Sequence, residues 1–305
     1  MNKYNVIYIM LGNCCARIKG VISRCCSIKK STVSNTTIIE TLGTGVYSTV
    51  YKIKRNGTIF ICKEIDIRYR NNLLREKIML DRINTKCKSI TDYPVLIEYG
   101  SNDKVWWLIT EYQKGRELFG WFNETIITKN KLDIRIIKKV FLEMVRLVAQ
   151  LHALDIVHLD IKMENFIILD TGNTNNIKLR LIDFDTAHDY TETMRNTTRF
   201  VGTIGYGDYH TSNGQYSNKS DIWSLGICLW ILLENKFPFN HSKIKYKTNI
   251  DPMLFIMPTN TNTYIYKNYE ETAIPLLRKM LNIDPDKISP IREILTDPWL
   301  NDIGG

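Results

Sequence analysis

Hydrophobic residues recur with two different spacings along the chain, and the change falls near Tyr112. Before it, the apolar segments are short, rich in β-branched residues and separated by Gly and Asn, which is typical of strands. The Asn56-Gly57 pair joins two such segments and is a strong signal for a two-residue hairpin. We therefore expect strands at Ile38–Leu42, Thr49–Lys54 and Thr58–Glu64.

Helical spacing takes over from the strands, first briefly and then for most of the remaining chain. Asn71–Ile83 predicts one helix embedded in the β-rich part. Ile134–Leu154 has one apolar face, and Ser220–Glu234 is apolar nearly all round, as in a buried central helix. Further helices are expected at Thr272–Leu281 and Pro290–Leu295. The pattern predicts an α+β protein with a small β-rich lobe followed by a larger α-rich lobe.

Composition narrows the class of protein. The chain has 305 residues, of which 44% are hydrophobic and 24% charged. These values are close to the globular average, so wholesale disorder, collagen and coiled coil are excluded. The apolar stretch Tyr4–Leu11 is far shorter than the ~20 residues that a membrane-spanning helix needs.

The net charge of +9 is concentrated in a short N-terminal segment. Six of the 41 Lys and Arg residues lie within residues 1–37, which contain no Asp or Glu. The other 35 face 32 acidic residues, so the body is nearly balanced. A basic segment attracts acidic surfaces of any kind, and we expect no specific nucleic-acid partner.

Four of the seven cysteines lie in the same segment, at Cys14-Cys15 and Cys25-Cys26. The remaining three are scattered and make no disulfide framework, which predicts a reducing, cytoplasmic location. Two interpretations of the segment stay open. It is either an extension without a specific role or an S-acylated, basic anchor on an anionic membrane. Adjacent cysteines lack the usual spacing of zinc ligands, and the body argues against a secretory signal.

Two motifs carry candidate chemistry. Gly43 and Gly45 lie between two expected strands, where residues without a Cβ let backbone N–H groups approach phosphates. More specific is His158-Leu-Asp-Ile-Lys-Met-Glu-Asn165, followed by Leu181-Ile-Asp-Phe-Asp185 across a strand pair around Thr171–Asn176. A carboxylate base, an ammonium, and an amide plus a second carboxylate for metal are what phosphoryl transfer requires.

With these residues the chain resembles the eukaryotic-type protein kinases over roughly residues 38–300. The glycine-rich loop is similar to Gly43-Thr-Gly-Val-Tyr-Ser-Thr-Val50, and the family's strand lysine matches Lys63. Its catalytic-loop and DFG motifs match His158–Asn165 and Asp183–Asp185. Asp221, in Ser220-Asp-Ile-Trp-Ser-Leu-Gly226, and the closing Ile294-Leu-Thr-Asp-Pro-Trp-Leu300 complete the resemblance. It implies a bilobal kinase fold with lobes at 38–112 and 113–300, after a segment 1–37 and before a tail 301–305.

The resemblance also implies roles for single residues. Asp160 is expected to receive or orient the substrate hydroxyl proton and Lys162 to neutralise the moving phosphoryl group. Asn165 and Asp183 are the expected metal ligands, and Thr110 the gatekeeper. Lys63 is expected to hold the nucleotide phosphates while paired with Glu76. The full set of nucleotide contacts that it implies is Leu42, Gly43, Gly45, Ser48, Val50, Lys63, Glu76, Glu111, Gln113, Glu117 and Ile167.

The substrate class follows from the same comparison. Lys162 and the Gly202-Thr203…Tyr206 pattern are similar to kinases that phosphorylate Ser and Thr in proteins. Glu117 and Glu164 match acids that basophilic members keep for a basic substrate residue. We therefore expect an ATP- and Mg²⁺-dependent Ser/Thr protein kinase that acts as a monomer. The alternatives are a catalytically weak pseudokinase scaffold and a small-molecule kinase of the aminoglycoside or choline type.

Several residues depart from the family pattern. Leu159 replaces the Arg that receives an activation-loop phosphate in the family. Ile61 replaces a smaller Ala that lies over adenine, and Ser48 replaces the third glycine of the glycine-rich loop. Asp185 replaces the DFG glycine. In a strand-like segment, Asp183 and Asp185 would share a face. The added negative charge is then expected to raise activity with Mn²⁺ relative to activity with Mg²⁺. The APE motif is absent. Its Glu becomes His210 and the partner Arg becomes Ile288, which indicates compensated divergence, since both ends of a pair are lost together.

The change at Leu159 also predicts how the enzyme is regulated. Leu cannot donate a hydrogen bond to a phosphate on Thr191, Thr193, Thr197 or Thr198. Arg195 and Arg199 lie on that segment itself and cannot anchor it elsewhere. We expect activity without activation-loop phosphorylation, with the segment held by packing around Phe200 and Tyr206.

Overall fold

The computed structural model describes residues 36–45, 47–87, 92–129, 132–170, 176–190, 201–238 and 271–302. They fall into two compact units, one formed by Met1–Leu73 with Leu96–Tyr112 and the other by Leu74–Val95 with Gln113–Gly305. None of the helices in the described residues is both long and apolar enough to cross a membrane. The N-terminal segment and its cysteines lie outside the described residues.

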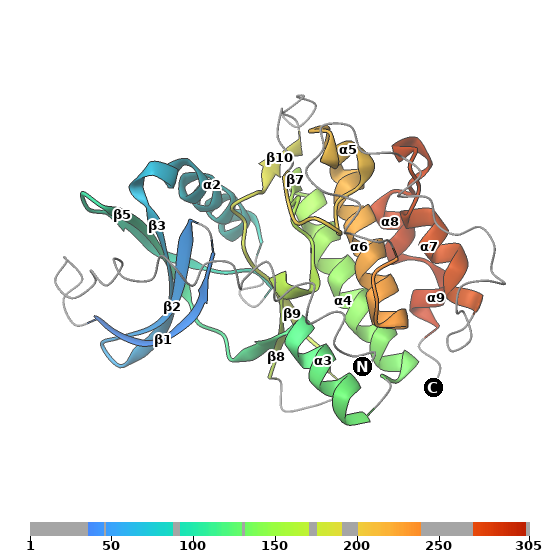
Figure 1. Cartoon of the computed structure of the whole chain (residues 1–305), viewed down its shortest axis with the longest axis horizontal. Coiled ribbons are helices and arrows are strands. Elements are labelled where there is room, and N and C mark those ends of the chain that lie inside the picture. The colour runs from blue at the N-terminus through green and yellow to red at the C-terminus, as the bar shows by residue number, and fades with distance from the viewer. Residues whose placement is uncertain are drawn as a thin grey trace, which may run out of the picture. The chain divides into compact units, whose positions relative to one another are not determined.

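The first unit is built on an antiparallel sheet (Figure 1). Its five described strands follow the order β1-β2-β3-β5-β4. Their bounds are β1 Thr36–Thr44, β2 Ser48–Arg55, β3 Thr58–Asp66, β4 Leu96–Ser101 and β5 Val105–Glu111. The 3₁₀ turn η3 Ile67–Tyr69 follows β3 and leads into helix α2.

The predicted hairpin between β2 and β3 is confirmed. Asn56 and Gly57 have φ values of 50° and 84°, the two left-handed positions of a type I′ turn. The turn sets the register in which Arg55 faces Thr58 and Val50 faces Lys63. Tyr51, Ile53, Cys62 and Ile109 then gather as the buried core on one face of the sheet.

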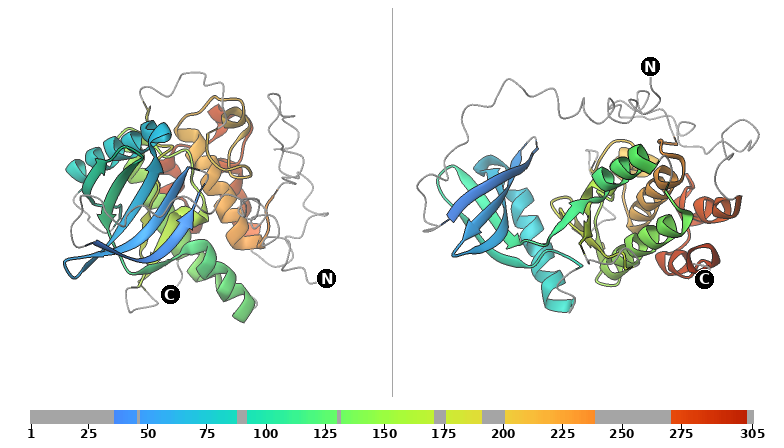
Figure 2. Two further views of the ribbon diagram at one scale, coloured as in Figure 1. Left: turned by 60° about the vertical axis from the view of Figure 1, so that its left-hand side comes forward. Right: turned by 90° about the horizontal axis from the view of Figure 1, so that it is seen from below.

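The second unit is mostly helical. Figures 1 and 2 show α4 and α6 side by side, and α7, α8 and α9 pack against these two helices. The helices are α2 Arg70–Lys86, which begins at the edge of the first unit, α3 Leu118–Lys129, α4 Ile134–His152, α5 Tyr209–Ser212, α6 Asn218–Glu234, α7 Ile274–Met280, α8 Ile291–Leu295 and α9 Pro298–Asn301.

Several short strands pack against helices α3 and α4 of the second unit. The short strands of this unit are β6 Gly115–Glu117, β7 Ile156–Val157, β8 Phe166–Leu169, β9 Leu179–Leu181 and β10 His188–Asp189. Strands β6, β8 and β9 pair in one small sheet, and β10 pairs with β7. Turns of 3₁₀ helix lie at η4 Met163–Asn165, η8 Glu271–Ala273 and η9 Pro285–Lys287.

The core of this unit explains why α4 and α6 are central. Helix α4 turns Ile137, Phe141, Met144 and Val148 inward. Helix α6 is buried along nearly its whole length, as its apolar sequence predicts. The predicted α+β fold is confirmed, with an antiparallel β-sheet first and a helical region after it.

Candidate active site

Asp160 is the centre of a hydrogen-bonded group in the loop of residues 158–165, here called the Asp160 loop. Its Oδ1 accepts a hydrogen bond of 2.6 Å from the Thr203 hydroxyl. Its Oδ2 accepts from Lys162 Nζ at 2.7 Å and from Asn165 Nδ2 at 3.1 Å. Lys162 Nζ also donates to Thr203 Oγ1 at 2.8 Å, which closes a ring of three side chains. Three donors therefore fix both oxygens of one buried carboxylate.

Lys162 remains a cation in this setting. Burial alone would lower the pKa of Lys162, but attraction to Asp160 and the hydrogen bond between them outweigh it and raise the pKa. The loop therefore offers a fixed positive charge beside a fixed carboxylate.

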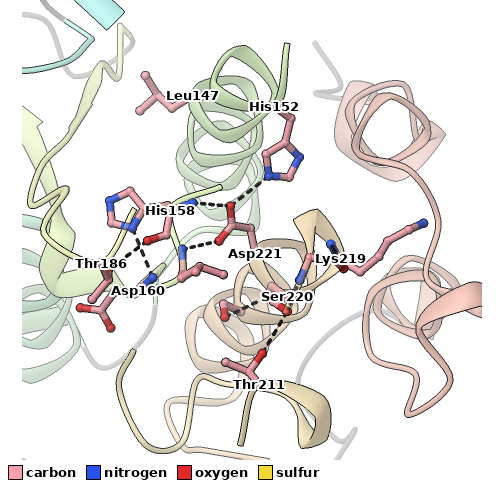
Figure 3. Close-up of polar contacts among 12 residues, drawn as sticks. Leu147, His152, His158, Asp160, Thr186, Thr211, Lys219, Ser220 and Asp221 are labelled. Carbon is pink, nitrogen blue, oxygen red and sulfur yellow. Dashed lines mark hydrogen bonds and ion pairs between the residues drawn. The ribbon is translucent and has the colours of Figure 1, made fainter. Parts of the chain in front are cut away.

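The backbone of the Asp160 loop is held by Asp221, in the first turn of α6 (Figure 3). Its carboxylate accepts from the backbone N–H groups of His158 at 2.9 Å and Leu159 at 2.8 Å. His152 Nε2, at the end of α4, lies 3.0 Å from Asp221 Oδ2. Burial would raise the pKa of Asp221, but these partners, His152 first, hold it below its ordinary value. A buried anion thus ties the loop to both central helices.

The His158 ring orients the loop from within. The Asp160 N–H donates to Nδ1 at 3.3 Å, so Nε2 carries the proton and donates to the Ile182 carbonyl at 3.2 Å. The Thr186 hydroxyl donates to the His158 carbonyl at 3.0 Å, as Figure 3 shows. These bonds join the loop to the chain on both sides of Asp183.

The two expected metal ligands come from neighbouring pieces of backbone. The N–H of Ile182, the residue before Asp183, donates to the Asn165 carbonyl at 2.9 Å. Asn165 Nδ2 points to Asp160. Asp183 has a φ of 66°, in the left-handed region, and β9 ends before it. The expectation of a strand-like segment was therefore wrong, so strand alternation gives no reason for Asp183 and Asp185 to share a face, and the preference for Mn²⁺ stays an untested prediction.

Glu76 lies on α2 and is buried. Its Oε1 is 3.5 Å from the N–H of Phe184, the residue after Asp183. Phe184 is fully buried between the rings of His158 and Tyr93, with centroids at 5.0 and 6.1 Å. Lys63 belongs to the first unit and Glu76 to the second, so their pairing stays a prediction.

In the first unit, the strand register places several of the residues expected around the nucleotide on one face of the sheet. Gly43 faces Val50, Val50 faces Lys63, and Ile61 faces Thr110. Directly opposed residues share a face, and so do alternate residues of one strand. This face is opposite to the one that carries the core of Tyr51, Ile53, Cys62 and Ile109. Ile65 and Leu108 are buried on this same face, and nucleotide binding there stays a prediction.

The glycine-rich turn connects β1 to β2. The Gly45 N–H donates to the Ser48 carbonyl at 2.8 Å, so Ser48 closes the turn in place of a third glycine. A Cβ added to Gly43 would meet no atom within 4 Å. Packing of the described residues thus does not require a glycine at residue 43, whereas close approach of a phosphate would. Leu42 is exposed on β1.

The remaining predicted contacts lie at element ends. Glu111 is the last residue of β5, and Gln113 begins the second of the two segments that form the second unit. Glu117 ends β6 directly opposite Ile167 of β8. Glu164 accepts a hydrogen bond from Tyr206 at 3.1 Å. Burial raises the pKa of Glu117 and of Glu164, and the Glu164 charge raises that of Glu117 further.

Sequence reasoning missed two parts of this arrangement. Thr203 was interpreted only as part of a pattern similar to that of Ser/Thr protein kinases, although its side chain bonds both Asp160 and Lys162. His152 was not singled out, because a His at a helix end has no distinctive spacing. Thr191, Thr193, Thr197, Thr198, Arg195, Arg199 and Phe200 lie outside the described residues, so the expectations that rest on them stay predictions.

Comparisons with curated proteins bear on the identity of this site. Calcium-dependent protein kinase 4 of Plasmodium berghei is 30% identical over 281 residues, which cover 86% of this chain and 48% of that protein. Calcium-dependent protein kinase 29 of Arabidopsis thaliana is 29% identical over 271 residues, covering 86% and 48%. Serine/threonine-protein kinase cds1 of Schizosaccharomyces pombe is 29% identical over 287 residues, covering 88% and 59%. The chain spans about half the length of these curated relatives.

The match to a family model is broader than any single motif. The model of the protein kinase domain matches residues 36–300, which include both units and every residue of the site. The resemblance to eukaryotic-type protein kinases is thereby confirmed, and the chain belongs to the protein kinase domain family.

Proposed function

We propose that this chain transfers the γ-phosphoryl group of ATP to Ser and Thr hydroxyls of protein substrates. The observation that carries the proposal is the Asp160 carboxylate, whose two oxygens are fixed by Thr203, Lys162 and Asn165. The relatives named above are protein kinases, which supports the same reaction class.

Each group of the Asp160 loop has a chemical task in this reaction. Asp160 accepts or orients the proton of the substrate hydroxyl, for which its held orientation is suited. Lys162, kept charged by Asp160, neutralises charge on the moving phosphoryl group. Thr203 fixes the angle between them. The catalytic contribution is positioning and electrostatics, as expected for phosphoryl transfer.

The metal ligands fit Mg²⁺. Because Asn165 uses its Nδ2 to bond Asp160, its Oδ1 is the atom left to act as an acceptor. With the Asp183 carboxylate it makes a set of hard oxygen donors, as Mg²⁺ prefers. Among the described residues, no three His, Cys, Asp or Glu side chains gather as a metal cage. Such a sparse set suits Mg²⁺, which takes its other ligands from water and phosphates and neutralises phosphate charge when bound.

For the nucleotide, the first unit offers Lys63 for the phosphates and Gly43 and Val50 on the same sheet face. The aliphatic Val50 and Ile61 supply apolar surface for a base. Ile61, larger than the family's Ala, is expected to tighten the space over adenine.

The substrate preference rests on Lys162, Thr203 and the acidic pair Glu117 and Glu164. Burial, and then the nearby Glu164 charge, raise the pKa of Glu117, and a basic substrate side chain would offset both. We therefore propose protein substrates with a basic residue near the phosphorylated Ser or Thr.

One assay tests this function against its rivals. Purified chain is incubated with labelled ATP, Mg²⁺ and either generic basic and acidic proteins or small alcohols and aminoglycosides. Label on Ser and Thr of the basic protein supports the proposal. Label on the small molecules alone favours a small-molecule kinase, and nucleotide binding without transfer favours a scaffold.

Location and attachment remain proposals that rest on the sequence. We propose a cytoplasmic monomer whose N-terminal cysteines and basic residues attach it weakly to anionic membranes. Acyl-exchange labelling and fractionation of the chain and of a Cys14, Cys15, Cys25 and Cys26→Ser variant test this. Equal membrane fractions for both would leave residues 1–37 as a simple extension.

A further inference from the structure

Leu159, the residue before Asp160, is buried in a small apolar group. Its side chain is 5% exposed and lies with Val157 and Tyr216, while Val201 packs against them. The four side chains come from β7, the Asp160 loop, residue 201 and the approach to α6. We call Val157, Leu159, Val201 and Tyr216 the apolar latch.

The backbone of Leu159 brings the latch against residue 202. Leu159 has a φ of 63°, a left-handed conformation that is costly for a non-glycine residue and is held here by the N–H bond to Asp221. Its carbonyl oxygen would lie 2.4 Å from a Cβ on Gly202, which itself has a φ of 101°. The two backbones therefore touch, and only glycine fits at residue 202.

The contact between the backbones of Leu159 and Gly202 lies directly beside Thr203. Thr203 follows Gly202 directly and bonds both Asp160 and Lys162. Val201, on the other side of Gly202, packs against the cluster that contains Leu159. Two consecutive residues therefore separate this cluster from the Thr203 hydroxyl.

One cation among the described residues, Arg75, lies close to the latch: burial raises the pKa of Tyr216, and the Arg75 charge partly offsets this. Tyr216 lies against the ring of His188, with centroids 5.6 Å apart. Burial, and then the nearby Arg75, lower the pKa of His188 to about 4, so this ring is neutral near pH 7. Arg75 itself points its Nη1 to the Asp185 carbonyl at 3.4 Å.

We propose that Leu159 is a positioning residue whose packing against Val201 holds Thr203 on Asp160 and Lys162 without any phosphate. The inference rests on the proposed phosphoryl transfer and adds its regulation. In the apolar latch, apolar packing takes the place of the ion pair between the family's Arg and an activation-loop phosphate. The packing does not depend on phosphorylation, so it is always present. Activity then depends on the size and shape of residue 159 and not on phosphorylation.

The test compares two substitutions at Leu159 with a matched one elsewhere. Full-length chain is treated with phosphatase and assayed for kcat and for the KM of ATP. We expect Leu159→Ala to lower kcat at least tenfold with the KM of ATP within twofold, and Leu159→Met to retain most of the wild-type kcat. Leu300→Ala removes an equally buried leucine from α9 and controls for lost stability.

The outcomes separate the latch from a purely structural role. Leu159→Ala and Leu300→Ala should lower the melting temperature alike, but only the first should lower kcat when both are assayed well below melting. Equal kcat for the two variants would overturn the latch. A tenfold loss of wild-type kcat on phosphatase treatment would also overturn it, since a phosphate would then be required.

Hydrogen exchange keeps the test decisive if the wild-type chain transfers no phosphate. That result would end the proposed function but not the latch. Peptides covering residues 201–206 should exchange faster in Leu159→Ala than in wild type or Leu300→Ala. Unchanged exchange in all three proteins would reject the latch on its own.

Discussion

Thr203 is the side chain on which the geometry of the active site depends most directly. Its hydroxyl donates to Asp160 and accepts from Lys162, so one group sets the direction of a base and of a cation. A hydroxyl has the one donor and the acceptor capacity that this double task needs, and few other side chains of this size do.

Thr203→Val keeps the shape and removes both bonds. A hydrogen bond to a charged group contributes about 1.5–3 kcal/mol, so kcat should fall by about 10- to 150-fold. Thr203→Ser keeps the hydroxyl and should stay near wild type. Steady-state kinetics measure this, and a Val variant with unchanged kcat would mean that Asp160 and Lys162 hold each other without help.

Asp221 makes a second residue-scale prediction, for stability. Asn at residue 221 would put an N–H₂ group against at least one N–H donor of His158, Leu159 or His152. Leaving buried donors of this kind without a partner costs about 3 kcal/mol in the free energy of unfolding. Urea unfolding of Asp221→Asn near pH 7 measures it.

The pH dependence of that difference follows from the pKa of Asp221, which is held below its ordinary value of 3.8. A lowered folded pKa stabilises the protein above the unfolded value and stops doing so as pH falls through the folded value. The gap between wild type and Asp221→Asn should therefore be constant down to about pH 4 and narrow below it. Asp103→Asn, on the surface, is the control; a gap that widens in acid would contradict the account.

At the scale of elements, a partly buried ion pair joins α4 to the chain that leads into β4. Arg146 forms two hydrogen bonds with Asp92, at 2.8 and 3.1 Å, and the Asp92 carbonyl accepts from Leu181 of β9 at 3.0 Å. The Asp92 side chain is 6% exposed. The pair therefore also fixes the strand that ends two residues before Asp183.

Arg146→Met should leave Asp92 buried without its main partner and cost about 3 kcal/mol in the free energy of unfolding. Adding Asp92→Asn should restore part of the loss, because no buried charge then remains. Urea unfolding of the two single variants and the double variant gives the coupling energy. Additive losses would mean that the pair contributes nothing as a pair, and Arg135→Met tests an exposed pair for comparison.

Elements with a clear period could be predicted from the sequence, and those that depend on tertiary contacts could not. The hairpin at Asn56-Gly57 and helix α4 follow from local chemistry and from an unbroken apolar face. Helix α3 was not predicted, although Leu118, Phe122 and Ile126 have helical spacing, because its mean composition is apolar without strong polar contrast. The left-handed turn at Asp183 has no sequence signal, since its φ is imposed by neighbours that are distant in sequence.

The candidate site shows the same division. Asp160, Lys162, Asn165 and Asp183 could be found because a motif places them at fixed spacing. Thr203 enters the site from 43 residues further along the chain, through a contact that only the fold creates.

At the scale of the whole molecule, the loss of the APE ion pair is matched by other bonds between the same regions. His210 Nε2 donates to the Ile283 carbonyl at 3.0 Å. Lys219 Nζ donates to the carbonyl of Ile288, whose side chain is buried. Hydrogen bonds to backbone carbonyls thus join α5 and α6 to the turn around residues 283–288.

Restoring one end of the lost pair should therefore destabilise the fold. Ile288→Arg buries a cation close to Lys219 and should cost about 3 kcal/mol or more in the free energy of unfolding. The double variant with His210→Glu should recover part of the loss. Thermal or urea unfolding measures both, and a neutral Ile288→Arg would show that residue 288 tolerates charge.

The central claim is that Asp160 performs phosphoryl transfer to protein, and one comparison tests it most directly. Turnover with labelled ATP and a generic basic protein is measured for wild type and Asp160→Asn, together with ATP affinity by calorimetry. We predict that transfer is lost while ATP binds with nearly wild-type affinity, because the proton acceptor is removed and the expected nucleotide contacts are not. Lys63→Met should weaken both phosphoryl transfer and ATP binding, so it serves as the control that the calorimetry detects a loss of ATP affinity. Near-wild-type turnover by Asp160→Asn would contradict the account.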